Sequence, residues 1–260
     1  MNLTARTVRS FANLILAIVI AAGLASNPAT AAEQAPAKPA AKDLPVEAIK
    51  DIVRQTILEN PEIIGEALLK LRQKKRQAKT QRAKRMIAAR RAELLNDPDS
   101  PVGGNPRGDV TVIEFFDYNC AYCRRTAPAI AELLRQDPAV RLVYKEYPIL
   151  GSSSVFAAQA ALAARAQGKY VALHEALMNA KGALSQDKIM EIAASVGIDT
   201  ARLRKDMGDP AIMDAISRNR VLARALGTKT TPSFVIGEEL VRGQKDLQTL
   251  RRLITAARAR

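Results

Sequence analysis

The sequence predicts an α/β domain that is interrupted by a helical block and preceded by a helical arm. Four strand-like segments belong to the α/β domain, and they read VTVIEFF, RLVYKEYPI, SFVIG and ELVRG. Between about residues 152 and 226 the pattern is Ala-rich and helical instead. The chain has 260 residues, of which 48% are hydrophobic and 25% charged, so it is long enough for one or two globular domains.

The first residues have the pattern of an export signal. Two arginines precede the apolar run 11–25, which is shorter than the roughly 20 residues that a membrane-spanning helix needs. Ala29 and Ala31 then form an A-x-A cleavage pattern. We therefore expect residues 1–31 to be a signal peptide that is removed from an exported protein, with an uncleaved membrane anchor as the alternative.

A helical stalk is predicted at residues 44–96, after an Ala/Pro/Lys-rich flexible linker at 32–43. Apolar residues recur there at helical spacing, and they are Ile49, Ile52, Val53, Ile57, Ile64, Leu68 and Leu71. Asn60 as N-cap and Pro61 at a first helical position divide the stalk into two helices. Because so short a segment cannot build a core alone, we expect it to self-associate. The alternative is that it packs on the rest of the chain.

The stalk ends in a strongly basic stretch. Residues 70–91 contain eleven Lys or Arg and no Asp or Glu, in a chain whose net charge is +14. Helix-forming residues continue through it while the apolar pattern fades, so we interpret it as a solvated helix or a hinge. We expect no nucleic acid as partner, because the protein is exported. An anionic membrane surface stays open as a partner.

The second domain is predicted at residues 97–260. Its start lies in the turn-rich stretch NDPDSPVGGNPRGD, whose Pro, Gly and Asn residues mark a domain boundary. The helical block at about 152–226 is an insertion between its second and third strand-like segments. A closing helix is predicted in QKDLQTLRRLITAAR.

Cys120 and Cys123 are the two cysteines of the chain, in the sequence FFDYNCAYC. A disulfide between them would close almost no loop, so it would constrain the unfolded chain little. Zinc needs about four ligands, and the pair with the single histidine, His174, offers at most three. Two thiolates could hold Cu(I), or an oligomer could pool its cysteines, and this alternative stays open. His174 lacks a catalytic Ser or Asp context and is interpreted as an ordinary helix residue.

Redox chemistry fits the cysteine pair best, because a CxxC after a strand and at the start of a helix is the pattern of thiol–disulfide exchange. A helix N-terminus favours a thiolate, which makes Cys120 the predicted nucleophile. Cys123, one turn further on, would resolve a mixed disulfide. Glu114 alternates in the strand onto the same face as Val112 and Phe116, which argues for a buried carboxyl, although a strand glutamate is more usually exposed to solvent.

These motifs, with a proline five residues after the second cysteine and the later sequence TTPSFVIG, resemble the thioredoxin superfamily and, within it, the DsbA family. The resemblance implies an α/β thioredoxin fold with an inserted helical domain. It also implies a cis peptide bond before Pro232 and a kink at Pro128 in the active-site helix. A glutamate at the position of Glu114 influences active-site protonation in similar proteins.

The residues between and opposite the cysteines suggest a functional class. Ala121 and Tyr122 replace the Pro-His of typical DsbA oxidases, which removes an imidazole that could stabilise a thiolate. The pattern CxYC with Thr231 before Pro232 is similar to that of disulfide isomerases. The resemblance thus implies catalytic roles for the two cysteines and the strand glutamate, and substrate binding by Tyr122, Thr231 and Pro232.

The arm at 44–95 resembles the stalk of the ScsC-like, copper-tolerance-associated branch of the family, which includes trimeric disulfide isomerases. The resemblance implies a periplasmic disulfide isomerase or reductase that acts on exported proteins with thiols or disulfides. It further implies a homotrimer and a membrane thiol reductase or oxidase that recycles the CxxC. We expect no bound metal or cofactor. A net dithiol oxidase and a Cu(I)-binding module are the alternatives.

Overall fold

The structure is a computed structural model that describes residues 45–259; the expected signal peptide and linker lie outside the described residues. The chain divides into two compact units between Asn60 and Pro61. The helices are α1 (Val46–Glu59), α2 (Glu62–Ala89), α3 (Arg91–Leu95), α4 (Ala121–Gln136), α5 (Ser152–Ala163), the 3₁₀ turn η1 (Ala164–Gln167), α6 (Tyr170–Asn179), α7 (Gln186–Ser195), α8 (Thr200–Asp206), α9 (Pro210–Leu226) and α10 (Leu247–Arg258). The strands are β1 (Val102–Gly104), β2 (Val110–Phe116), β3 (Val140–Glu146), β4 (Ser233–Ile236) and β5 (Glu239–Arg242).

Helix α1 ends at Asn60, so the prediction that this residue is the N-cap of the second stalk helix is wrong. Its side-chain Nδ2 donates to the carbonyl oxygen of Thr56 at 2.9 Å, and its backbone N–H donates to the same oxygen at 3.0 Å. Asn60 therefore ends α1 rather than capping α2, whose N-cap position is occupied by Pro61. None of the residues of α1 is buried.

Helix α2 runs without interruption through the basic stretch, because no Gly or Pro occurs between residues 66 and 95. Its first five turns are exposed, whereas Ala83 and Ile87 near its end are buried. This end packs on β5 and α9, and Leu94 of α3 is buried in the same cluster. The last turns of the predicted stalk therefore belong to the core of the following domain.

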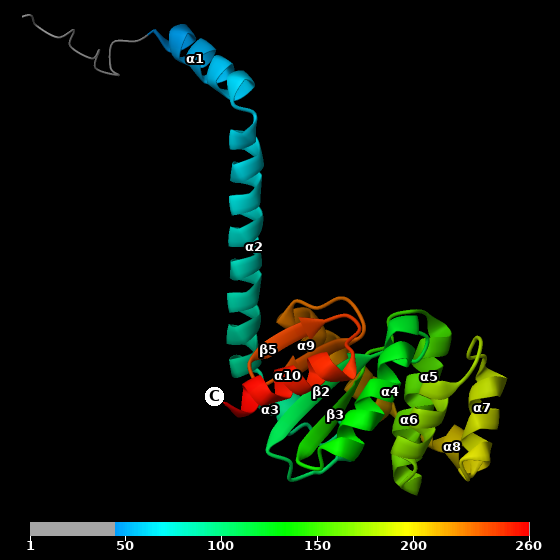
Figure 1. Cartoon of the computed structure of the whole chain (residues 1–260). Coiled ribbons are helices and arrows are strands. Elements are labelled where there is room, and N and C mark those ends of the chain that lie inside the picture. Colours follow the sequence, from blue (N-terminus) through cyan, green and yellow to red (C-terminus); the bar gives the residue numbers. More distant parts are fainter. Residues whose placement is uncertain (1–44, 260) are drawn as a thin grey trace, which may run out of the picture. The chain divides into compact units, whose positions relative to one another are not determined.

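The five strands form one mixed sheet in the order β1-β3-β2-β4-β5 (Figure 1). Strand β2 is parallel to β3 and antiparallel to β4, and the outer pairs are antiparallel. In this register Glu114 lies beside Tyr144 of β3 and Phe234 of β4. This arrangement confirms the predicted α/β thioredoxin fold.

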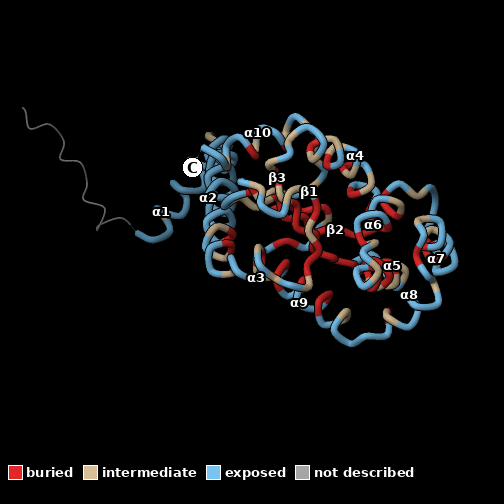
Figure 2. The backbone as a smooth tube through the Cα atoms, turned by 90° about the horizontal axis from the view of Figure 1, so that it is seen from below, coloured by how far each residue is buried: buried red, intermediate tan, exposed pale blue. Residues whose placement is uncertain are grey.

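Two hydrophobic clusters cover the two faces of the sheet, and the central strands β2, β3 and β4 between them are almost entirely buried (Figure 2). Val112 and Phe116 contribute to the cluster that includes α4, α10 and the helices α5 to α8. Ile113 and Phe115 point the other way, into the cluster of α2, α3 and α9. Glu114 shares its face with the first pair, as the strand alternation predicts.

The helical block comprises α5 to α9, but its last helix has two roles. Ala215 and Ile216 of α9 pack in the cluster of the inserted helices, whereas Leu222 and Leu226 pack on the opposite face of the sheet. The end of α9 thus belongs to the thioredoxin fold itself, because it covers one face of the sheet.

Strand β1 lies where the sequence indicated only turns. Its three residues, Val102–Gly104, pair antiparallel with β3. A Cβ atom at Gly103 would lie 2.7 Å from the hydroxyl of Tyr144, so the close approach requires glycine. Two glycines in three residues carry no strand pattern, which explains the missed strand.

Between residues 45 and 259, no helix combines the length and the apolar composition that a bilayer crossing requires.

Candidate active site

Cys120 occupies the N-cap of α4, directly after the loop that follows β2. Its backbone is extended, with φ −78° and ψ 112°, and its Sγ accepts the N–H of Cys123 at 3.4 Å. An unpaired N–H at a helix start and the helix dipole both favour negative charge there. The sequence therefore places this sulfur where a thiolate is stabilised.

The cis peptide bond between Thr231 and Pro232 lies opposite Cys120, as the resemblance implies. The Cys120 thiol donates to the carbonyl oxygen of Thr231 at 3.3 Å. The pKa of Cys120 is lowered to about 6, chiefly by hydrogen bonding to the Cys123 side chain. The Thr231 side chain and the backbone N–H groups of Cys123 and Tyr122 lower this pKa further, against a partial burial that raises it.

Cys123 is chemically unlike its partner. It is fully buried, and burial raises the pKa of its thiol far above the ordinary value. Contact with the Cys120 sulfur and the charge of Glu114 raise this pKa further, whereas a backbone hydrogen bond from Asp117 lowers it. Both cysteines are free thiols. At neutral pH one sulfur is therefore an available thiolate and the other is a proton-bearing thiol.

Glu114 is 2% exposed, and burial together with the negative charge of Cys120 raises the pKa of its carboxyl to about 8. It lines a cavity of about 410 Å³ between α4 and α6. Pro128 of α4, Tyr144 of β3 and His174 of α6 are among the other lining residues. Burial thus agrees with the sequence argument, and the cavity offers a route from the carboxyl towards solvent.

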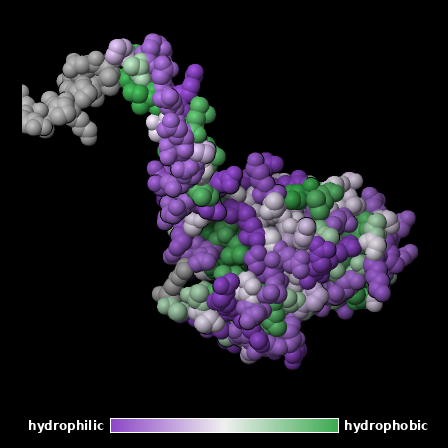
Figure 3. Space-filling model, turned by 45° about the horizontal axis from the view of Figure 1, so that its top comes forward, coloured by the Kyte–Doolittle hydropathy of each residue, from purple (hydrophilic) through white to green (hydrophobic). Residues whose placement is uncertain are grey.

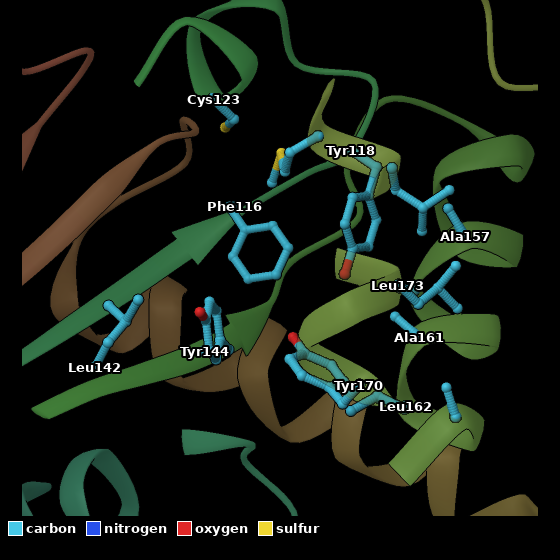
Figure 4. Close-up of a cluster of buried hydrophobic side chains, with 14 of the residues drawn as sticks. Phe116, Tyr118, Cys123, Leu142, Tyr144, Ala157, Ala161, Leu162, Tyr170 and Leu173 are labelled. Atoms are coloured by element: carbon cyan, nitrogen blue, oxygen red, sulfur yellow. The ribbon is translucent and has the colours of Figure 1, made fainter. Parts of the chain in front are cut away.

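A buried polar network holds the loop that leads to Cys120. The hydroxyls of Tyr118 and Tyr170 both donate to Oε1 of Glu146 at 2.8 Å (Figure 4 shows both tyrosines). Nδ1 of His174 lies 3.2 Å from the Tyr118 hydroxyl, and burial lowers the pKa of this imidazole to about 3. His174 therefore packs as a neutral ring in an aromatic cluster with Phe116, away from proton transfer at neutral pH.

Asp117 connects the active-site loop to the loop after β3. Its Oδ1 accepts the N–H of Asn119 at 2.8 Å, and its Oδ2 accepts the N–H groups of Ile149 and Leu150 at 2.7 and 3.0 Å. The backbone carbonyl of Asp117 also accepts the N–H of Cys120 at 3.0 Å. One carboxylate thus fixes both loops next to the nucleophile.

Three exposed apolar side chains lie near the cysteine pair. In residues 97–259 the exposed large apolar side chains are Tyr122, Ile149, Leu150, Val171 and Val221. We define the apolar rim as Tyr122, Ile149 and Leu150, which are 56%, 38% and 51% exposed. Tyr122 lies between the cysteines, with the Arg125 guanidinium 4.5 Å from its ring centroid. Exposure of apolar groups beside a reactive sulfur is typical of a surface that binds another chain.

The predicted site residues lie together around the cysteines, and His174, the predicted ordinary helix residue, is buried in the core. Sequence reasoning missed Asp117, Glu146 and the pair Ile149–Leu150. An Asp in the turn before the first cysteine is a recognisable signal, because Asp accepts backbone N–H groups of nearby residues. Glu146 and the apolar pair gave no such signal, since their roles depend on contacts about 30 residues away.

Two family models match the chain. The DSBA-like thioredoxin domain matches residues 111–255, and the copper resistance protein ScsC N-terminal domain matches residues 46–78. The first of these covers more than half of the chain.

Solved structures agree with these matches. A thioredoxin-like oxidoreductase from Silicibacter pomeroyi is 50% identical, with a TM-score of 0.64 over 65% of this chain and 98% of that one. A Proteus mirabilis ScsC variant with a linker deletion is 28% identical, with a TM-score of 0.65 over 85% and 99%. A periplasmic thioredoxin-like protein from Salmonella enterica serovar Typhimurium is 33% identical, with a TM-score of 0.61 over 65% and 96%.

Curated relatives include Na⁺/H⁺ antiporters, such as one from Salinispora tropica that is 28% identical over 191 residues, or 67% of this chain. The chain spans only 25–29% of the length of the first three of these relatives. The similarity therefore concerns one domain of those larger proteins. On the family models, the solved structures and the CxxC geometry together, the chain belongs to the DsbA-like thioredoxin family and carries the N-terminal domain of its ScsC branch.

Proposed function

We propose that the protein is a periplasmic thiol:disulfide oxidoreductase that isomerises or reduces disulfides of exported proteins. The observation that carries this proposal is the contrast within the CxxC, a thiolate-forming Cys120 beside a buried, protonated Cys123. A thiolate is the attacking species in disulfide exchange, and a thiol held in reserve can end the reaction.

The proposed reaction needs no cofactor, because each step of disulfide exchange breaks one S–S bond and forms another. The Cys120 thiolate attacks one sulfur of a substrate disulfide, forms a mixed disulfide and releases the other sulfur as a thiolate. If a substrate thiolate then attacks the mixed disulfide, the substrate is isomerised without net redox change. If Cys123 attacks the Cys120 sulfur instead, the substrate is released as a dithiol, reduced by two electrons. The enzyme is then left with a disulfide between Cys120 and Cys123.

Glu114 has the properties needed for the second route. Cys123 must lose its proton before it can attack. In the free enzyme burial and the charge of the Cys120 thiolate raise the pKa of Glu114 to about 8, so its carboxyl is mostly protonated at pH 7. Formation of the mixed disulfide removes the Cys120 charge and lowers this pKa, which frees a carboxylate to accept the Cys123 proton. The cavity beside Glu114 supports exchange of that proton with solvent. We assign Glu114 the role of proton acceptor for Cys123.

Substrate binding is assigned to the two sides of the nucleophile. An extended substrate segment would lie against Thr231 and Pro232, whose backbone faces the Cys120 sulfur. The apolar rim would contact apolar side chains that flank the substrate cysteine. Such side chains are exposed in incompletely folded proteins, which supports misfolded exported proteins as the substrate class.

The lowered thiol pKa bears on the direction of the reaction. Thioredoxin, a reductant, has a cysteine pKa of about 7, whereas the strong oxidant DsbA has about 3.5. A value of about 6 for Cys120 is closer to the reductant. This favours isomerisation or reduction, which requires that a membrane thiol reductase keep the CxxC reduced.

The stalk supports an oligomer, and we propose a homotrimer. Seven apolar side chains of α1 and α2, at the positions predicted for the seam, are each 37–52% exposed in the described chain. A second and third copy would bury them, and several active sites around one substrate raise the effective thiol concentration.

The central experiment is reactivation of scrambled, fully oxidised ribonuclease by the mature protein. We expect activity in glutathione buffer that disappears in Cys120→Ser. Cys123→Ser should retain attack but accumulate the mixed disulfide, visible as a covalent complex on a non-reducing gel. Failure of the wild-type protein to reactivate ribonuclease, with Cys120 still reactive to alkylation, would reject the isomerase assignment.

Two alternatives make different predictions. A net oxidase would introduce disulfides into reduced ribonuclease faster than it reshuffles the scrambled form. A Cu(I) carrier would bind Cu(I) tightly through the same two sulfurs and show no disulfide exchange. The same preparation tested in both ribonuclease assays and in competition with a Cu(I) chelator separates these outcomes.

A further inference from the structure

The positive charge of the chain is concentrated in one segment. Residues 70–91, defined here as the basic segment, carry eleven positive charges and no negative one. The whole chain has a net charge of +14, so the other 238 residues together contribute only +3. The nearest carboxylates in sequence are Glu66 and Glu93. A charge distribution this uneven predicts attraction of an anionic partner to this segment rather than to the whole surface.

The basic side chains of the first part of the segment are exposed to solvent. Every residue from 70 to 82 is exposed, and hydrophilic atoms cover most of the visible side of the helix (Figure 3). Glu239 apart, no carboxylate of the described residues forms an ion pair with a basic group between Lys70 and Arg82. The first pair of the segment is that of Arg90 with Glu93. The charge of residues 70–82 is therefore exposed to solvent and available to a partner.

The geometry of the helix suggests the kind of partner. From residue 70 to 89 the segment is α-helical, and at 1.5 Å per residue it extends about 30 Å. Successive basic residues such as Lys74, Lys75 and Arg76 point about 100° apart, so the charge surrounds the helix axis. A folded acidic protein would match one face only. A bilayer rich in anionic headgroups matches any face, since the long Lys and Arg side chains can bend towards one plane.

We propose that the basic segment docks on an anionic phospholipid bilayer and holds the protein at the membrane surface. The attraction is electrostatic and needs no redox chemistry, so it stands apart from the assigned catalytic function. Each basic residue near such a surface strengthens binding by about fivefold, and several copies in one oligomer would act together. Docking would bring the CxxC close to a membrane-bound recycling enzyme.

The test is cosedimentation of the reduced, full-length mature protein with lipid vesicles. We expect binding to phosphatidylcholine vesicles that contain phosphatidylglycerol, weak binding to pure phosphatidylcholine, and release as the salt concentration rises. The neutralised variant replaces Lys74, Lys75, Arg76 and Lys79 with Gln, a good helix former. Its partitioning should fall by about 100-fold or more, with the helix content unchanged by circular dichroism.

A matched variant removes the same number of charges from the catalytic domain. Arg204, Lys205, Arg251 and Arg252 are all exposed, and their replacement with Gln should change vesicle binding by less than about threefold. Equal losses in the two variants would overturn the proposal, because overall charge would then control binding. Equally tight binding of the wild-type protein to pure phosphatidylcholine vesicles and to the anionic vesicles would overturn it as well. Binding to a short DNA duplex as tight as to the anionic vesicles would assign the segment to polyanions in general and reject lipid docking.

Discussion

The sulfur of Cys120 lies 3.3 Å from the carbonyl oxygen of Thr231, on the residue before the cis-proline. This contact exists only while the sulfur carries a proton, since a carbonyl oxygen cannot donate. Loss of the proton breaks it and leaves the N–H of Cys123 and the helix N-terminus as the stabilising groups. The carbonyl is then free to accept a backbone N–H from a bound peptide, which couples ionisation of the nucleophile to substrate binding.

The ionisation of Cys120 can be measured directly. With a pKa of about 6, its thiolate forms as the pH rises through that value, so the alkylation rate by iodoacetamide should be half-maximal near pH 6. Replacing Cys123 by Ala removes the main hydrogen bond that lowers this pKa and should move the midpoint upward. A wild-type midpoint near the ordinary cysteine value of about 8.5 would contradict the proposed stabilisation.

Glu114 should reduce stability at neutral pH. In the unfolded chain the Glu114 carboxyl loses its proton above about pH 4.5, whereas in the folded protein it keeps the proton up to about pH 8. The free energy of unfolding therefore falls as the pH rises between these two values. Glu114→Gln should therefore stabilise the protein by roughly 3 kcal/mol at pH 7, with no gain near pH 4. Urea unfolding of both proteins across this pH range measures the difference.

The same variant should be slower in resolution, since Gln cannot accept the Cys123 proton. The exposed Glu238→Gln serves as the control and should change neither property. A stability gain that does not depend on pH would show that packing, rather than the carboxyl charge, is responsible.

The apolar rim should distinguish protein substrates from small ones. We expect Ile149→Ser with Leu150→Ser to lower the rate of ribonuclease reactivation by about tenfold. Each side chain is about half exposed, so burial of the two exposed parts together contributes on the order of 1.5 kcal/mol. Alkylation of Cys120 by a small reagent should be unchanged. Val171→Ser and Val221→Ser, equally apolar and exposed, form the control pair. An equal loss in the control pair would remove the rim from the substrate surface.

The stalk can be tested without disturbing the catalytic domain, because its seam ends at Leu71 and its buried part starts at Ala83. Deletion of residues 44–71 should convert the oligomer to a monomer in sedimentation velocity and lower isomerase activity. Deletion to residue 95 would also remove Ile87 and Leu94 from the core, and its effects would mix unfolding with assembly. A shortened protein that stayed oligomeric would place the interface elsewhere.

A buried ion pair fixes the start of the domain to the sheet. Lys145 of β3 has a fully buried side chain and donates to the carbonyl of Glu93 and to Oδ2 of Asp97, both at 2.8 Å. Lys145→Met leaves the Asp97 charge without its partner and should cost about 3 kcal/mol of unfolding free energy. Lys188→Met removes an exposed pair with Glu191 and should cost less than about 0.5 kcal/mol. Comparable costs in urea unfolding would refute the structural role of the buried pair.

Short sequence patterns predicted the features that depend on neighbouring residues in the chain. Strand alternation places Glu114 on the face of Val112, and the CxxC after a strand indicates the helix N-terminus. The sequence could not predict that Glu146 binds two tyrosines, or that Asp117 holds Ile149 and Leu150, because these contacts join distant segments. Strand β1 has too few side chains to show a period.

The continuity of α2 has a mechanical consequence. Ile87 near its end is a core residue of the catalytic domain, and the helix contains no Gly or Pro between there and Gly65. A force applied along the helix is therefore transmitted to the hydrophobic cluster under β5 and α9, rather than absorbed by a soft joint. The catalytic domain would yield by extraction of that last turn, so its resistance to pulling should depend on Ala83 and Ile87 more than on any surface contact.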